Sequence, residues 1–219
     1  MRARVGQRYE VVVNGVLRLG SVRTVAEDRV ELDLAEEIQS EAVVPVTLVV
    51  AMFKFDRFEW AVEKATELGV TRIVPAIARR TDAHLVQAAK KRVERWRRIA
   101  HEAAQQSRRV AAPEIDEPVK LKAAMSIDAR LKILLAETEQ DRSLKDALRE
   151  SRSEATRVHN PAIENDSLAL AVGPEGGWTE DEIQLFMTNG WIPATLGPTI
   201  LRAETAVIAG LAVVAALSK

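Results

Sequence analysis

The sequence predicts an α/β fold with a mostly parallel sheet, preceded by a small β domain. Short apolar segments alternate with longer amphipathic ones, which is the pattern of buried strands and crossover helices. The chain has 219 residues and is 47% hydrophobic, enough for one large core with a small appendage. Its first 40 residues or so instead alternate in short pieces around a turn, as hairpins do.

The small β domain is expected over residues 1–42. Asn14 and Gly15 separate two runs of alternating apolar residues. Both central positions of a type I′ turn need positive φ, which these two residue types adopt readily. A hairpin is therefore expected here, and the larger domain is expected over residues 43–219.

The first strand of the large domain is expected at 43–52, where an apolar, β-branched run is interrupted only by a proline and a threonine. A helix should follow. Asp56 is its expected N-cap, with Glu59 three residues later, and Gly69 is the residue expected to end it. The next strand is expected at 72–77.

Further along, the helical period returns over residues 86–109, and an apolar run at 131–136 predicts another strand. A helix is expected around 143–150. The following stretch, 151–167, is polar and charged and contains an Asn-Pro pair, so it is expected to be a mobile surface loop.

Two glycine-bearing loops follow strands near the C-terminus. An apolar strand at 168–172 runs into Gly-Pro-Glu-Gly-Gly at 173–177, and a second loop at 196–202 leads into a helix that opens near Glu204. Glycines let backbone amides approach a bound molecule closely. Since ligands of parallel sheets bind beyond the carboxyl ends of strands, the two loops are expected to form one crevice.

Composition and motifs exclude several classes of function. The chain has no cysteine and only three scattered histidines, so neither a disulfide nor a metal site is predicted. No GxGxxG motif follows a strand and no Walker loop is present, which disfavours dinucleotide and nucleoside triphosphate sites. The longest apolar run, 206–217, has twelve residues and is too short to span a membrane, so a cytoplasmic location is expected.

Four blocks occur in a recognisable order: KATELGV at 64–70, EAAQQSRR at 102–109, GPEGG at 173–177 and LGPTILRAETA at 196–206. Together they resemble the 16S ribosomal RNA uridine N3-methyltransferase family of the SPOUT superfamily. The resemblance implies methylation of a specific uridine of the small-subunit RNA, with S-adenosylmethionine as cofactor. It also implies a homodimer and a C-terminal trefoil knot within about residues 168–219, an exception to the rule that folds are unknotted.

The resemblance further implies a PUA-like β-barrel at the N-terminus. The sequence starts after the family's usual leading strand and basic helix, so this barrel is expected to be N-terminally shortened. Two alternative functions remain open: an RNA-binding or ribosome-assembly protein of the same fold without catalysis, or a SPOUT methyltransferase acting on another RNA. No membrane partner is expected.

The chemistry of the implied reaction selects candidate catalytic residues. Removing the proton from uracil N3 leaves a delocalised negative charge, which the guanidinium of Arg202 is suited to stabilise. Glu204 or Glu175 is expected to accept the proton. The alternative for Arg202 and Glu204 is a structural ion pair at a helix start.

The cofactor is expected to be held largely by backbone groups of three loops, which comprise Leu134, Ala136, Glu137, Gly173, Pro174, Gly176, Leu196, Gly197, Ile200 and Leu201. Trp178 beside them suits two roles, a base-stacking platform or the hydrophobic staple of a capping box formed by Thr179 and Glu182, and the staple is favoured. For KATELGV, a helix and its terminator are favoured over a ligand role of Lys64 or Glu67.

A cluster of cations predicts the RNA-binding surface. Eight Lys and Arg residues fall within positions 90–109, while the whole chain has a net charge of −1. A charge run is often only a solvated helix face, but phosphate binding is favoured here because any RNA site must be a local patch. The candidates are Lys90, Lys91, Arg95, Arg98, Arg108 and Arg109. Arg79 and Arg80 are possible extensions of this surface.

The helix at 206–217 is apolar nearly all round its circumference. Such a helix requires burial on more than one side, so it is expected to lie at the interface of a homodimer.

Overall fold

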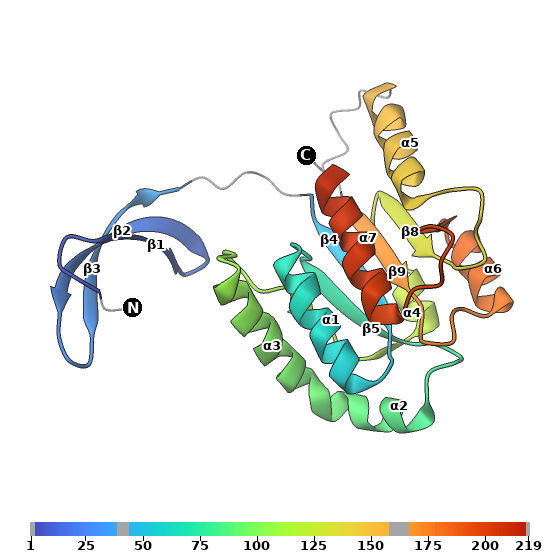
Figure 1. The fold of residues 1–219 in the computed structure, drawn as a ribbon, viewed down its shortest axis with the longest axis horizontal. Coiled ribbons are helices and arrows are strands. Elements are labelled where there is room, and N and C mark those ends of the chain that lie inside the picture. The colour runs from blue at the N-terminus through green and yellow to red at the C-terminus, as the bar shows by residue number, and fades with distance from the viewer. Residues whose placement is uncertain (1–2, 39–43, 158–166, 218–219) are drawn as a thin grey trace. The chain divides into compact units, whose positions relative to one another are not determined.

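The computed structural model describes residues 3–38, 44–157 and 167–217 (Figure 1). Contacts divide the chain into two units, Met1–Val43 and Val44–Lys219. The first unit is a three-stranded antiparallel sheet in the order β1 (Arg8–Val13), β2 (Val16–Val25) and β3 (Val30–Glu37). The predicted hairpin turn is confirmed, because Asn14 and Gly15 have φ values of 52° and 76° and Val13 pairs with Val16.

The second unit contains a sheet whose strand pairings are all parallel, in the order β10-β8-β9-β4-β5-β6, with β7 also pairing β5. The mostly parallel α/β sheet predicted from the sequence is thus confirmed. Its strands are β4 (Val46–Ala51), β5 (Arg72–Ile77), β6 (Glu114–Ile115), β7 (Val119–Lys120), β8 (Leu131–Leu135), β9 (Leu168–Val172) and β10 (Ile192–Ala194).

Helices cover both faces of this sheet (Figure 1). They are α1 (Phe55–Glu67), α2 (Ala83–Ala89), the 3₁₀ helix η1 (Lys90–Arg92), α3 (Val93–Gln106), α4 (Leu121–Met125), α5 (Leu144–Arg157), α6 (Glu180–Thr188) and α7 (Ala203–Leu217). Alternate residues of each strand enter different cores. In β4, Leu48 and Val50 pack in the core with α1, α3, α5 and α7, whereas Val49 and Ala51 pack in the core with α4 and α6.

Glycine allows α7 to approach the sheet closely. A Cβ atom on Gly210 would lie 3.0 Å from Leu135 Cδ1 and 3.1 Å from Leu170 Cδ2. Any larger side chain at this position would push the helix away from β8 and β9. The middle of α7 is therefore held close to β8 and β9.

Two predicted helix boundaries are wrong. Helix α1 begins at Phe55, with Lys54 as an N-cap that makes no side-chain bond, and Asp56 lies in the first turn. Packing explains the earlier start, because the Phe55 ring lies 6.0 Å from that of Trp96. Helix α5 continues to Arg157, so 151–157 is helical rather than loop. The remainder of that predicted loop, 158–166, lies outside the described residues.

The predicted helix signals at Gly69 and Thr179 are confirmed. Gly69 has a φ of 95° and follows the C-cap, and Val70 N donates to Ala65 O at 3.2 Å, closing the last turn of α1. At the start of α6, Thr179 and Glu182 form both bonds of a capping box.

Candidate active-site cleft

The loops after β8, β9 and β10 line one cleft of about 710 Å³, part of which is open to solvent. All three strands are parallel, so their carboxyl ends lie at the same edge of the sheet. The structure therefore brings together the two glycine-bearing loops that the sequence analysis placed in one crevice. Most of the candidate cofactor and catalytic residues line it, namely Ala136, Glu137, Gly173, Pro174, Glu175, Leu196, Gly197, Ile200 and Leu201.

Two candidate cofactor residues do not line the cleft. The side chain of Leu134 is completely buried in the core beneath α4 and α6, because strand alternation turns it away from the loops. Gly176 turns its carbonyl oxygen to the guanidinium of Arg80. A Cβ atom on Gly176 would lie 3.2 Å from Arg80 Cδ, so a larger residue there would require the arginine side chain to shift.

The GPEGG loop, residues 173–177, packs closely on its neighbours. Gly177 has a φ of 68°, and a Cβ atom there would lie 2.5 Å from Glu137 Oε1. A Cβ atom on Gly173 would lie 3.2 Å from Trp178 Nε1. Both glycines leave the backbone within reach of a molecule in the cleft.

Trp178 forms part of the cleft wall but is fixed in the core. Its indole N–H donates to Leu135 O at 3.1 Å, and its ring meets Phe186 of α6 at 4.9 Å. Ile183 packs against the same core. These contacts agree with the favoured staple role and leave the ring only 6% exposed, too little for a free base-stacking platform.

Arg57 in α1 joins the two candidate proton acceptors, a role that the sequence analysis did not identify. Its Nη1 lies 2.7 Å from Glu175 Oε1, and its Nε lies 3.7 Å from Glu204 Oε1. The Glu204 side chain is only 7% exposed. Its Oε2 is buried and has no hydrogen-bond partner among the described residues.

The predicted alternative of an ion pair between Arg202 and Glu204 is therefore wrong, because Arg57 takes that place. Arg202 is exposed, and within the described part of the chain its side chain makes no ion pair or hydrogen bond. Its carbonyl oxygen accepts from Ala206 N at 2.8 Å in the first turn of α7. The backbone of Arg202 is thus fixed while its guanidinium is available to a ligand. Neither Arg202 nor Glu204 lines the cleft itself, although Leu201 and Ala203 beside them do.

Comparison with known proteins decides the family. Residues 40–215 match the family described as RNA methyltransferase domain. The chain belongs to this RNA methyltransferase family. The ribosomal RNA small subunit methyltransferase E of Synechocystis is 36% identical over 82% of this chain and 55% of its own length. The protein of the same name from Bacillus subtilis is 31% identical over 88% of this chain and 75% of its own length.

A solved structure has the same fold. The crystal structure of a ribosomal RNA small subunit methyltransferase E from Neisseria gonorrhoeae, bound to S-adenosylmethionine, matches 98% of this chain and 84% of its own. The TM-score is 0.75 and the sequence identity is 25%. With 98% of the chain covered, the match extends over both units.

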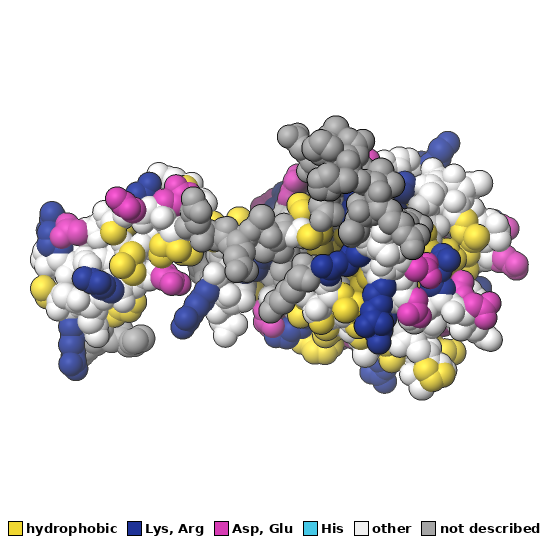
Figure 2. Space-filling view, turned by 90° about the horizontal axis from the view of Figure 1, so that it is seen from above, with side chains coloured by type: hydrophobic (Ala, Val, Ile, Leu, Met, Phe, Trp, Pro, Cys, Tyr) yellow, Lys and Arg dark blue, Asp and Glu magenta, His cyan; other side chains and the backbone are white. Residues whose placement is uncertain are grey.

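The cations predicted to bind RNA differ in their exposure and in the contacts of their side chains. Lys90, Lys91, Arg98 and Arg108 are exposed, and their side chains have no bonded partner among the described residues. Arg95 pairs with Glu59 of α1 at 2.8 Å. Figure 2 shows Lys and Arg side chains interspersed with Asp and Glu side chains on both units, in line with the nearly neutral composition.

Arg109 must be removed from the predicted RNA surface. Its Nη1 donates to Thr66 O at 2.8 Å and to Val70 O at 2.7 Å, and its Nη2 donates to Gly69 O at 3.3 Å. Burial lowers the pKa of Arg109 from its usual value, and no carboxylate offsets this effect. Its guanidinium instead satisfies the carbonyl groups at the C-terminal end of α1.

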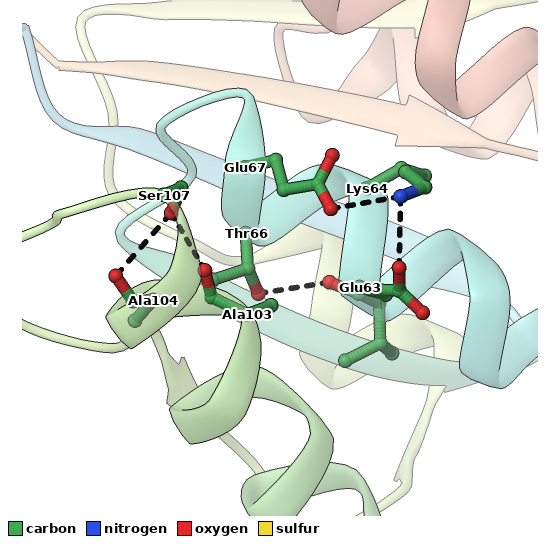
Figure 3. A network of polar contacts seen from close by, with 8 residues as sticks. Glu63, Lys64, Thr66, Glu67, Ala103, Ala104 and Ser107 are labelled. Atoms are coloured by element: carbon green, nitrogen blue, oxygen red, sulfur yellow. Dashed lines mark hydrogen bonds and ion pairs between the residues drawn. The ribbon is translucent and has the colours of Figure 1, made fainter. Parts of the chain in front are cut away.

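The blocks KATELGV (64–70) and EAAQQSRR (102–109) therefore meet at the C-terminal ends of α1 and α3, and neither lines the cleft. Figure 3 shows Lys64 between Glu63 and Glu67, both at 2.8 Å, and Ser107 bonded back to Ala103 and Ala104. The two carboxylates raise the pKa of Lys64. These contacts agree with the favoured role of KATELGV as a helix and its terminator.

The described residues contain neither a metal-binding cluster nor a membrane-spanning helix. Nowhere in 3–38, 44–157 and 167–217 do three or more His, Asp or Glu side chains converge in a way that could hold a metal ion. Across the same ranges, no helix combines the length and apolar character needed to cross a membrane.

Proposed function

We propose that this protein transfers a methyl group from S-adenosylmethionine to N3 of a specific uridine in 16S ribosomal RNA. One observation carries the proposal: in a chain of the RNA methyltransferase family, a carboxylate, Glu175, and two glycine-bearing loops line the same strand-end cleft. The Neisseria relative, which shares this fold, holds S-adenosylmethionine.

The residues of the cleft fit this cofactor. The cleft is partly open to solvent, and it is lined by residues of two loops, 173–177 and 195–201, whose backbone amides and carbonyls can bind a ligand. Such groups suit the adenine ring, and the carboxylate of Glu137 on the wall suits the hydroxyl groups of a ribose. When bound, S-adenosylmethionine supplies an electrophilic methyl group.

Residues of the chain supply the other two parts of the reaction, which are removal of the N3 proton and stabilisation of the resulting negative charge. Uracil N3 must lose its proton, and Glu175 is the better placed acceptor because it lines the cleft and is 39% exposed in its side chain. Glu204 is buried behind the loop and faces Arg57. The guanidinium of Arg202, which has no bonded partner among the described residues and lies between the cleft-lining residues Leu201 and Ala203 in the chain, stabilises the negative charge that develops on the uracil.

Calorimetry tests the cofactor assignment. We expect S-adenosylmethionine and S-adenosylhomocysteine to bind, and NAD to give no heat, because the cleft has no dinucleotide fingerprint. A methylation assay on small-subunit RNA, with mapping of the modified base, then tests the N3 assignment. No detectable binding of either cofactor form at millimolar concentration would overturn the proposal.

The same proposal includes three further features: a trefoil knot in the C-terminal part, a PUA-like domain in residues 1–42, and a cytoplasmic homodimer. The dimer is supported by α7, whose face away from the core carries Ile208, Ala209, Ala212 and Ala216. On α1, which contacts α7, the Trp60 side chain is also 45% exposed. An apolar surface of this kind is suited to a second copy.

Light scattering tests the dimer. At tens of micromolar protein, where an obligate dimer persists, we expect twice the mass of the single chain. Ala212→Glu would place a charge in the apolar surface and should yield the monomer, whereas Arg149→Glu on the exposed side of α5 should leave the mass unchanged. A wild-type protein of single-chain mass would contradict the dimer.

A further inference from the structure

The GPEGG loop is held from outside the cleft by two arginines. Arg57 comes from the first turn of α1, which follows β4, and Arg80 comes from the loop after β5. Arg57 Nη1 contacts the carboxylate of Glu175 at 2.7 Å, and Arg80 Nη1 donates to the carbonyl oxygen of Gly176. Two neighbouring residues of the loop are therefore fixed by two guanidinium groups from two other strand ends.

Arg57 also connects the GPEGG loop to the second loop of the cleft. Its Nε lies 3.7 Å from Glu204, which stands in the first turn of α7, directly after the loop at 196–202. Glu204 is buried, and a buried carboxylate needs a countercharge. A planar guanidinium can serve two carboxylates in a fixed geometry, whereas a lysine ammonium is a point charge on a flexible stem.

We propose that Arg57 and Arg80 are positioning residues, which hold the GPEGG loop in the shape that binds the cofactor. Arg57 additionally orients Glu175 toward the proton it accepts. This inference rests on the proposed function. The physical reason is that a loop containing three glycines has many accessible conformations, and ordering it in advance lowers the entropy cost of binding.

The neighbouring residue Arg79 differs from Arg80 because its side chain pairs with Asp181 of α6 and not with the GPEGG loop. Among the described residues its guanidinium contacts only Asp181, at 2.8 Å, and both side chains are largely exposed, at 68% and 83%. Ion pairs between exposed side chains contribute little to the stability of the fold. Its backbone N–H donates to Glu182, a bond that any side-chain substitution leaves intact. Arg79→Ala is therefore a matched control for Arg80→Ala, one position away on the same loop.

The first experiment measures the Kd of S-adenosylmethionine by calorimetry for the full chain and three variants. Arg57→Lys and Arg80→Ala should each raise the Kd about tenfold, the scale of one lost charge-assisted hydrogen bond, and Arg79→Ala should leave it unchanged. Arg57→Lys keeps a countercharge beside Glu204, so the variant should still fold. Melting temperatures are recorded alongside.

The second experiment separates the two arginines. In single turnover at saturating cofactor, Arg80→Ala should recover the wild-type rate because it acts on loop shape alone. Arg57→Lys should remain slow because Glu175 is misoriented. In a double-mutant cycle on the rate, Arg57→Lys should have a smaller effect in a Glu175→Gln background, because the acceptor is already lost.

Melting temperature, cofactor Kd and single-turnover rate together distinguish a positioning role of Arg57 and Arg80 from a merely structural one. Lower melting temperatures with unchanged Kd and rate in both variants would show that the two contacts only stabilise the fold. Fully additive effects in the cycle would remove the link between Arg57 and Glu175. If the wild-type chain itself bound no cofactor, the proposed function would fail, and the positioning role would fail with it.

Discussion

Arg202→Ala is expected to lower the single-turnover rate by about two to three orders of magnitude, as the loss of one oxyanion-hole donor does. In the proposed mechanism the guanidinium stabilises charge that develops on the uracil only as N3 loses its proton, so its effect should be confined to the transition state. Cofactor affinity should change little. The assay uses small-subunit RNA with saturating S-adenosylmethionine, and calorimetry on the same preparation gives the cofactor Kd.

The structure sharpens this prediction. Because Glu204 pairs with Arg57, loss of the Arg202 side chain breaks no described ion pair, and the melting temperature should stay unchanged. Arg202→Lys should restore only part of the rate, since a single ammonium cannot match the guanidinium fork. Arg149→Ala, which removes an exposed arginine from α5, should behave as wild type. Full activity in Arg202→Ala would remove this residue from the mechanism.

Features encoded by adjacent residues were predictable from the sequence. The buried strands β4, β5, β8 and β9 are predominantly apolar runs, and the capping box of α6 needs only Thr179 and Glu182. Helix boundaries that depend on distant partners were not. Helix α1 starts early because Phe55 packs on Trp96, which lies in another helix. Nothing near Asp56 in the sequence reports that contact.

The same distinction applies to the site. Glycines identified both cleft loops, and a lone carboxylate added to the signal of the first, because local backbone freedom is visible in the sequence. Arg57 and Arg80 were missed as contacts of this site because they reach it from 118 and 96 residues away, respectively. A lone arginine in the first turn of an amphipathic helix is usually just solvated. Only the parallel strand order, which places the ends of β4, β5 and β9 side by side, brings these side chains to the loop.

Arg109, in the cation run at 90–109, is expected to stabilise the fold and not to bind RNA. Arg109→Ala should lower the free energy of unfolding by about 2 to 3 kcal/mol, because it leaves carbonyl groups of Thr66, Gly69 and Val70 without their charged donor. Urea unfolding measures this loss. Where the variant is folded, RNA affinity and its salt dependence should match the wild type.

Arg98→Ala should show the opposite pattern. Arg98 is exposed on α3 with no bonded side-chain partner among the described residues, so stability should change by less than about 0.5 kcal/mol. RNA binding should weaken, and the slope of log affinity against log salt should fall by about 1. The two arginines are thus distinguished by stability and salt slope in one pair of variants. A reduced salt slope in Arg109→Ala, at unchanged stability, would return Arg109 to the RNA surface and refute its role at the end of α1.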